Sequence, residues 1–264
     1  MEFFSQVWAI VTQFFSQVWV IVTQYYPYLL SGVGMTMLIA VTGTAVGFLI
    51  GMLTGVIRTA PRSRHGAVRV LHRIVNGLIA VYIEIFRGTP MMVQAMVIYW
   101  GYAFANGGQT LPLIPAGIFI VSINTGAYMA EIVRGGILSV EKGQTEGAYA
   151  VGMTHGQAML HVVIPQVLRN ILPSVSNEFV INIKDTSVLN VIGVAELYYM
   201  AGVIKRINLQ TFQVYTVICV LYFLLTFTVT RLLRLAEKKL AGSDSYTICG
   251  SQSDPSAEIH IKEA

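Results

Sequence analysis

The chain has 264 residues; 55% of them are hydrophobic, 11% are charged, and the formal net charge is +4. Soluble domains carry about 25% charged residues, so a chain this poor in charge cannot cover its surface against water. The composition therefore excludes an ordinary soluble domain and predicts a protein embedded in a lipid bilayer. The two cysteines, Cys219 and Cys249, lack the spacing of a disulfide framework or a metal site.

The first notable feature is a tandem repeat at the N-terminus: residues 3–13, FFSQVWAIVTQ, recur almost unchanged as residues 14–24, FFSQVWVIVTQ. Eleven residues make nearly three helical turns, so both copies present the same face. Polar residues fall on one side and Phe, Val, Ile and Trp on the other. Segment 1–27 is therefore predicted to be an amphipathic helix lying in the membrane interface, with Trp8 and Trp19 at headgroup level. A duplication with no role beyond anchoring is the alternative. The acidic start, without a basic region, argues against a cleaved signal peptide.

Five apolar stretches follow Pro27, each near the roughly 20 residues that a helix needs to cross a bilayer. They are residues 28–57, 74–104, 113–138, 174–202 and 212–235. The second and the fourth are long, so we expect tilt or a part that projects into water. The sequence thus predicts an all-α integral membrane fold with five transmembrane helices.

Basic residues concentrate in alternate connections between these stretches. Those that follow the first, third and fifth stretches are Arg58, Arg62, Arg64, Arg69, Arg73, Arg134, Lys142, Arg169, Arg231, Arg234, Lys238 and Lys239. The other connections carry only Lys205 and Arg206. By the positive-inside rule the N-terminus lies outside and the C-terminus in the cytoplasm, so we expect a multi-pass protein of the cytoplasmic membrane of a prokaryote.

The first stretch contains glycines at intervals of four, namely Gly43, Gly47, Gly51 and Gly55. Such a ridge lets a second helix approach backbone to backbone, which is how membrane helices associate without a hydrophobic driving force. The ridge therefore predicts a helix-packing surface. A sliding interface in a moving transporter is the alternative use of the same surface.

Residues 146–166, EGAYAVGMTHGQAMLHVVIPQ, are too short and too polar to cross a bilayer. Gly152 suits the left-handed position that closes a helix, and Thr154 with Gln157 forms a capping-box pattern that starts another. Pro165 is expected to limit the far end of that second helix. The pattern predicts a helix–glycine–helix unit lying across the cytoplasmic ends of the spans.

Small residues in this unit, Ala148, Ala150 and Gly152, leave a surface that a second protein can grip, and Glu146 offers an acid to a basic partner. The unit resembles the cytoplasmic coupling loop of ABC importer permeases, whose pattern is E-A-A-x3-G-x9-I-x-L-P. The matching positions here are Glu146, Gly147, Ala148, Gly152, Val162, Ile164 and Pro165. Gly147 in place of alanine loosens the first helix by up to about 1 kcal/mol.

Three more segments resemble the polar amino acid subfamily of these permeases, the relatives of histidine, glutamine and arginine permeases. They are residues 84–94 (EIFRGTPMMVQ), 127–140 (AYMAEIVRGGILSV) and 177–197 (NEFVINIKDTSVLNVIGVAEL). The resemblance implies a type I ABC importer-like transmembrane domain over residues 28–240, with a coupling loop and coupling helix at 146–166. Residues 241–264 are polar and lack helical periodicity, so we expect a disordered tail.

The resemblance also implies a permease subunit that translocates polar amino acids in company with other chains. The expected partners are cytoplasmic ATPase subunits docked on the coupling loops, an extracytoplasmic amino acid-binding protein, and a second permease, identical or related. The chain has no G-x4-G-K-[ST] phosphate loop, no HExxH and no GxSxG. We therefore expect no catalytic residue, metal or cofactor on this chain, with ATP bound by a partner subunit, and no nucleic acid partner.

Ionisable residues inside apolar spans usually face a cavity, because exposing them to lipid is costly. A zwitterionic amino acid needs one group for its carboxylate and another for its ammonium. The candidate residues for the substrate pathway are Glu84, Asn124, Glu178, Lys184, Asp185 and Ser187. Adjacent residues do not share a helix face, so we expect one of Lys184 and Asp185 to face the path while the other pairs internally. Arg87 and Arg134 are expected to anchor cytoplasmic ends of spans.

Two other functions stay open on the sequence alone. A secondary transporter driven by an ion gradient would normally carry an inverted repeat and broken helices in matching halves, and the repeat found here is only the N-terminal 11-mer. An intramembrane enzyme is disfavoured by the missing motifs.

Overall fold

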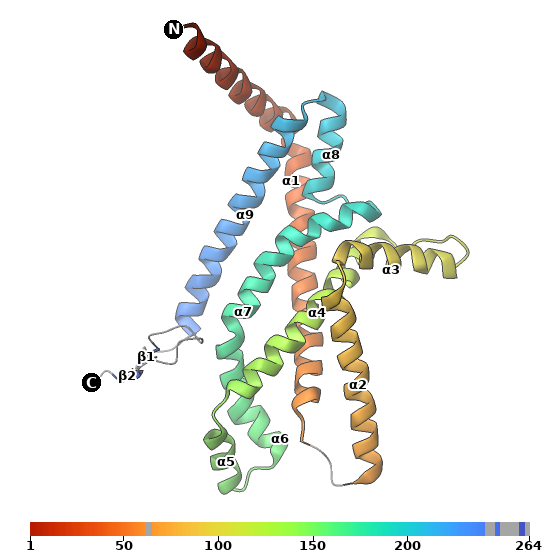
Figure 1. The fold of residues 1–264 in the computed structure, drawn as a ribbon, viewed down its shortest axis with the longest axis vertical. Coiled ribbons are helices and arrows are strands. Elements are labelled where there is room, and N and C mark those ends of the chain that lie inside the picture. Colours follow the sequence, from red (N-terminus) through yellow and green to blue (C-terminus); the bar gives the residue numbers. More distant parts are fainter. Residues whose placement is uncertain (62–64, 241–245, 249–258, 262–264) are drawn as a thin grey trace.

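Figure 1 shows the computed structural model, which describes residues 1–61, 65–240, 246–248 and 259–261 as an elongated helical bundle. Its helices are α1 (Glu2–Thr59), α2 (Gly66–Gly88), α3 (Met91–Ala105), α4 (Leu113–Ser139), α5 (Lys142–Ala150), α6 (His155–Ala158), the π-helical turn η1 (Met159–Val163), α7 (Ile164–Asp185), the 3₁₀ segment η2 (Thr186–Ile192), α8 (Leu197–Asn208) and α9 (Thr211–Leu240). Five stretches are long and apolar enough to cross a membrane: Phe3–Thr59, Gly66–Gly88, Leu113–Ser139, His155–Ile192 and Thr211–Lys239. The predicted number of spans is confirmed, while several boundaries differ.

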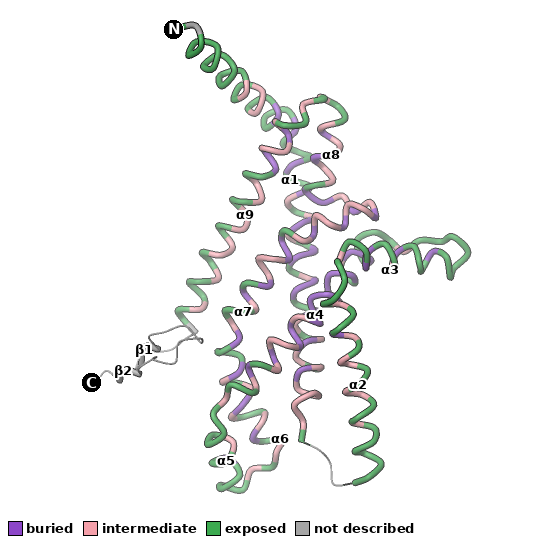
Figure 2. The backbone as a smooth tube through the Cα atoms, viewed as in Figure 1, coloured by how far each residue is buried: buried purple, intermediate pink, exposed green. Residues whose placement is uncertain are grey.

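Burial is concentrated where α1, α4 and α7 meet, and the outer helices are largely exposed (Figure 2). Many exposed side chains are large and apolar, such as Leu49 on α1, Leu78 on α2 and Phe223 on α9. In water this would be unfavourable, but lipid tails are as apolar as leucine. The exposed apolar surface therefore fits a bilayer.

The N-terminal repeat is helical, and a kink at Tyr25 separates it from the first span, close to the boundary expected at residue 27. The φ of −111° and ψ of 16° at Tyr25 are not helical, although α1 continues on both sides of the kink. Pro27 lies two residues further on and cannot donate a helical hydrogen bond, which accounts for the kink. The second repeat copy packs on the start of α9: Gln213 Nε2 donates to Gln17 Oε1 at 2.7 Å.

The second expected span, 74–104, is broken into α2 and α3. The break lies at Thr89, which is extended (φ −125°, ψ 148°) and precedes Pro90. A residue before proline avoids the helical region, and proline has no N–H to donate. Gln94 Nε2 fills the gap by donating to the carbonyls of Phe86 and Thr89, at 3.0 and 2.9 Å. The expectation of one continuous helix here is wrong, because apolarity alone does not reveal this turn.

The fourth expected span, 174–202, is also displaced. The helical path begins at His155 and continues through η1, α7 and η2 to Ile192. It ends at Gly193, whose φ of +94° lies in the left-handed region that favours glycine. α8 is a separate helix after this turn, so the span starts earlier and ends earlier than expected.

The glycine ridge of α1 lies against α4. A Cβ added to Gly43 would come within 2.6 Å of Val121 Cγ1, and one added to Gly51 within 2.2 Å of Met129 Cβ. The other two ridge positions behave alike: a Cβ at Gly47 would lie 2.7 Å from Thr125 Cβ, and one at Gly55 would lie 2.7 Å from Val133 Cγ1. The facing α4 residues are also four apart, so the two helices interlock along their length.

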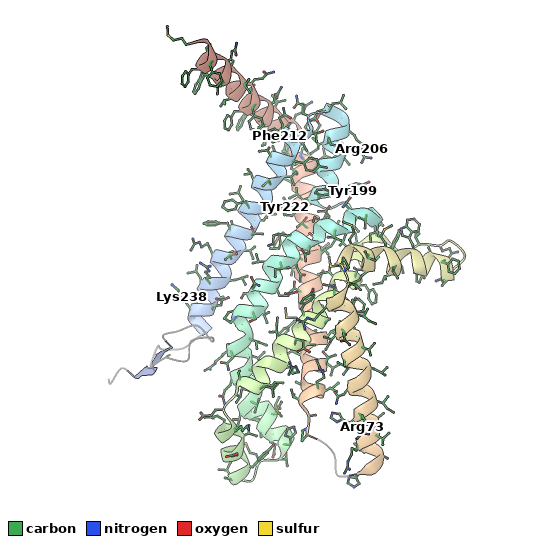
Figure 3. All side chains as sticks on the ribbon, viewed as in Figure 1. Arg73, Tyr199, Arg206, Phe212, Tyr222 and Lys238 are labelled. Carbon is green, nitrogen blue, oxygen red and sulfur yellow. The ribbon has the colours of Figure 1, made fainter. Side chains whose placement is uncertain are left out.

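Glu196 joins α8 to α9 at the other end of the bundle. Its fully buried carboxylate accepts hydrogen bonds from the backbone N–H groups of Tyr198 and Tyr199, at 2.8 and 2.7 Å. The Tyr222 hydroxyl from α9, labelled in Figure 3, donates at 2.9 Å. A carboxylate at a helix N-terminus satisfies N–H groups that the helix leaves unpaired.

The C-terminal tail contains two described strands, β1 (Tyr246–Ile248) and β2 (Ile259–Ile261), which pair antiparallel with Tyr246 opposite Ile261. The rest of the tail, predicted to be disordered over residues 241–264, lies outside the described residues. Arg62, Arg64 and Cys249 lie outside them too.

Candidate functional site

Residues 142–158, which we call the elbow, contain α5 and α6 and lie at one end of the bundle (Figure 1). α5 closes at Gly152, whose φ is +85°. The N–H of Gly152 donates to the carbonyl of Tyr149 at 2.9 Å, and the N–H of Met153 donates to that of Ala148 at 3.1 Å. These bonds satisfy the last carbonyls of α5, which is the usual role of a left-handed glycine after a helix.

α6 begins with the predicted capping box. Thr154 N donates to Gln157 Oε1 at 2.9 Å, and Gln157 N donates to Thr154 Oγ1 at 3.4 Å. The hydroxyl of Tyr149 on α5 hydrogen-bonds His155 Nδ1 on α6 at 2.9 Å. The two arms of the elbow are therefore joined by side chains as well as by the turn.

Of the elbow residues that the sequence assigned to a docking surface, Glu146, Gly147, Ala150 and Gly152 are exposed. Ala148 differs, since it is only 5% exposed and α5 packs on η1. The surface that a second protein could reach therefore excludes Ala148.

Pro165 does not end the second helix, so that expectation is wrong. It lies in the first turn of α7, where its missing N–H costs little. The π-helical turn η1 directly precedes it and connects α6 to α7 without a break in helical backbone. The elbow is therefore continuous with the fourth span.

An ion-pair cluster connects α1 to α4 at the elbow end. Glu131 on α4 pairs with Arg58 at the end of α1 and with Arg134 one turn further along α4, whose Nε donates at 2.9 Å. Arg134 thus has the anchoring contact that the sequence predicted. Breaking a partly buried pair would leave a charge without compensation.

Beside this cluster lies a cavity of about 650 Å³, lined by Arg58, Ala80, Ile83, Glu84, Arg87, Gly88, Tyr128 and Glu131. The guanidinium of Arg87 lies over the Tyr128 ring, 5.5 Å from its centroid. Arg87 is at the end of α2 far from the α1–α2 turn, since α2 begins at Gly66 and rises about 1.5 Å per residue. Arg87 therefore lies at the opposite end of α2 from the basic α1–α2 connection, and its role as an anchor stays a prediction.

Neither acid of α7 lines the Arg87 cavity. Glu178 is buried, and Asp185 and Arg87 are near enough to influence it electrostatically. Lys184, in contrast, is exposed and lines a hollow against α9. Lys184 and Asp185 thus point to different sides, and the structure groups Glu178 and Asp185 with Arg87, which the sequence had assigned to anchoring.

Two further candidates have structural contacts. Asn124 Nδ2 donates to Gln94 Oε1 at 2.8 Å, so Asn124 belongs to the polar cluster that closes the α2–α3 turn. Ser187 is half-buried, and its backbone carbonyl accepts from Asn190 Nδ2 at 3.0 Å. Arg87 is a functional candidate that the sequence assigned to anchoring instead. Its separation in the sequence from the basic α1–α2 connection could have indicated that it lies at the other end of α2.

The sequence profile of the family described as "Binding-protein-dependent transport system inner membrane component" matches residues 47–242. The chain belongs to this family. Among its relatives, the glutamine transport system permease protein GlnP of Escherichia coli is 36% identical over 214 residues, covering 81% of this chain and 93% of that protein. The L-cystine transport system permease protein TcyB of Bacillus subtilis is 34% identical over 215 residues, covering 81% and 87%.

Solved structures agree with this family. An amino acid ABC transporter crystallised with histidines is 35% identical, with a TM-score of 0.71 over 83% of this chain and 97% of that one. The MetNI methionine ABC transporter, at 20% identity and a TM-score of 0.67 over 82% and 98%, shares the fold. This inner-membrane component is therefore a permease subunit of an ABC importer, with ATP hydrolysis on a separate subunit, and not an ion-driven secondary transporter.

Proposed function

We propose that this permease subunit serves an importer of polar amino acids. Its relatives are named for glutamine and L-cystine, and a related transporter was crystallised with histidines. These molecules differ in side chain and share the zwitterionic backbone. A site that recognises a carboxylate and an ammonium would therefore serve all of them.

The Arg87 cavity has the size and the groups for such a site. Ligand pockets typically measure about 300–1,000 Å³, and this one measures about 650 Å³. Among the described residues Arg87 has no carboxylate within 4 Å, so its guanidinium is available for a substrate carboxylate. Glu84 lines the cavity and offers an acid for the ammonium group. Glu178 does not line it, but Arg87 is near enough to influence Glu178 electrostatically.

The observation that carries the proposal is the continuous helical path from the elbow into α7. α6, η1 and α7 follow one another without a turn, and α7 carries Glu178 and Asp185. A displacement of the elbow by an ATPase would thus be passed along one rod to the acids beside Arg87. The permease would alternate between two states of access, and the ATPase would bias their populations.

The assembly we propose places the elbow in the cytoplasm and the N-terminus outside. Arg73 lies toward the elbow end, Arg206 toward the opposite end, and Lys238 between them at the lower end of α9 (Figure 3). The excess of Lys and Arg in the connections on the elbow side supports this orientation. Glu84 and Arg87 are exposed on an open face of a membrane-spanning chain, which supports a second permease subunit, identical or related, that covers them. The ATPases would bind the elbows, and an extracytoplasmic binding protein would dock at the α8 end.

Uptake of radiolabelled glutamine into proteoliposomes tests the proposal. The vesicles would hold this chain, its ATPase and its binding protein. We expect uptake to need internal ATP and to be absent with an ion gradient alone. R87Q should raise the KM for uptake at least tenfold with the maximal rate changed less, while R87K should recover part of the affinity.

Arg73→Gln is the matched control, because it removes one exposed arginine of α2 that lies outside both the cavity and the elbow. If the R87Q variant took up glutamine with an unchanged KM, the assignment of the Arg87 cavity as the substrate site would be contradicted. Uptake driven by an ion gradient without ATP would contradict the proposed energy source.

A further inference from the structure

A groove lies between α7 and α9 and shares no residue with the Arg87 cavity. It consists of two adjoining hollows, of about 250 Å³ and about 120 Å³, that have Val180, Thr230 and Arg234 in common. α9 leans away from α1 along this side of the bundle (Figure 1). The groove opens on a face where apolar side chains such as Phe223 and Phe227 are exposed.

The groove is cationic. Lys184, Arg231 and Arg234 line it, and Glu237 is the one acid among its lining residues. Within the described residues, the ion pairs closer than 4 Å are those of Glu131, so none of these three cations has a carboxylate partner. Arg231 instead lies over the Phe227 ring, 5.0 Å from its centroid. The groove therefore holds positive charge that its own walls do not neutralise.

The charge pattern of α9 indicates that the cations lie near the lipid headgroups. Residues 211–230 of α9 contain no charged side chain, which is about the 20 residues that the bilayer core requires. Arg231 and Arg234 follow directly, so they begin the interface on the elbow side. Lys184 lies beside Phe223 and Phe227, deeper in the span, and a lysine at that depth extends its ammonium toward the interface.

Ser176 provides a second, independent observation. It lines the smaller hollow, is only 8% exposed, and its hydroxyl has no hydrogen-bond partner. A buried hydroxyl normally finds a partner, because leaving it unpaired costs about 1–3 kcal/mol. An oxygen-rich ligand in the groove would supply that partner.

We propose that the α7–α9 groove binds an anionic phospholipid. The phosphodiester lies between Arg231, Arg234 and Lys184, within reach of the Ser176 hydroxyl, and an acyl chain follows the exposed ring of Phe223. Basic pockets between transmembrane helices recognise anionic headgroups in this way. The lipid would neutralise the groove and brace α9 against α7, whose far end joins the elbow.

Native mass spectrometry of the full chain in detergent tests the site, with dioleoyl phosphatidylglycerol and dioleoyl phosphatidylcholine offered in equal amounts. We expect the wild type to retain phosphatidylglycerol in preference to phosphatidylcholine. R231Q/R234Q should lower phosphatidylglycerol occupancy at least fivefold. K238Q/K239Q removes the same charge from the end of α9 outside the groove, where Lys238 is labelled in Figure 3, and should leave occupancy unchanged.

Single variants keep the test decisive if the double variant folds poorly. S176A and K184Q should each reduce the preference for phosphatidylglycerol about twofold or more, with melting temperatures in lipid-free detergent like that of the wild type. Equal retention of both lipids, or an equal loss in K238Q/K239Q, would overturn the proposal. Displacement of the lipid by millimolar inorganic phosphate would assign the site to a free anion, and a change of oligomeric state in R231Q/R234Q would assign the groove to a second copy of this chain.

Discussion

Replacing Gly51 with alanine is expected to weaken the pairing of α1 with α4. The added Cβ would lie 2.2 Å from Met129 Cβ, 2.7 Å from the Met129 carbonyl carbon and 2.9 Å from Ala130 N. Real Cβ contacts essentially never fall below 3.0 Å. Because two of the three atoms are backbone, no rotamer change relieves the contact, and the helices must separate.

The size of the effect follows from two opposing contributions. Overpacking of a tight contact costs about 1–3 kcal/mol, and alanine is up to about 1 kcal/mol better than glycine inside a helix. Gly34, also in α1, has no atom within 4 Å of an added Cβ. G34A therefore gains the higher helix propensity of alanine without any steric cost. G51A should therefore be less stable than G34A by about 1–3 kcal/mol, the contact cost that the two variants do not share.

Thermal unfolding in detergent measures this difference. For a chain of this size, 1 kcal/mol corresponds to about 2–4 °C, so G51A should melt roughly 4–8 °C below G34A for a 2 kcal/mol difference. G43A offers a partial rescue test, because V121A removes the Cγ1 that would lie 2.6 Å from the added Cβ but keeps the Cβ at 2.9 Å. Equal melting temperatures for G51A and G34A would refute the interlocked ridge.

Two further changes test other parts of the account. E196A should lower the melting temperature, because it leaves the N–H groups of Tyr198 and Tyr199 and the Tyr222 hydroxyl without their acceptor. A buried group left unpaired costs about 1–3 kcal/mol, and a part-buried one costs less. E196Q, which keeps an acceptor oxygen, should lose less, and an E196A chain that melts like the wild type would contradict this. G152A should reduce ATP-coupled uptake without changing the melting temperature of the bundle. The φ of +85° at position 152 is strained by about 1–2 kcal/mol for a residue with a Cβ, and this strain is confined to the elbow. G147A, which adds a Cβ in open space in α5, is its comparator, and equal uptake by both variants would count against a rigid elbow.

Hydropathy and residue spacing predicted the features that a regular or local pattern of residues in the sequence determines. Five spans could be counted because lipid-facing helices must be apolar over about 20 residues. The α1 glycines recur every four residues, and this spacing indicated the surface that lies against α4. The capping box at Thr154 and Gln157 was also visible, because its bonds join residues only three apart.

The features that the sequence did not predict depend on single residues or on tertiary contacts. The break at Thr89 lies within a continuous apolar stretch, and it is closed by Gln94, whose bonds back to the turn cannot be read from hydropathy. The π-helical turn before Pro165 turns an expected helix end into a continuous rod. The proximity of Arg87 on α2 to Glu178 on α7 relates residues far apart in the sequence, which no local pattern encodes.

Site-directed cross-linking gives the most direct test that the elbow is where an ATPase drives this permease. Cys219 and Cys249 would be replaced with serine, and a single cysteine placed at Ala150, exposed on α5, or at Leu209, which is 84% exposed at the α8–α9 turn. In membranes containing the whole transporter, A150C should cross-link to the ATP-hydrolysing subunit and L209C should not. A cross-link from L209C to that subunit, with none from A150C, would contradict the account.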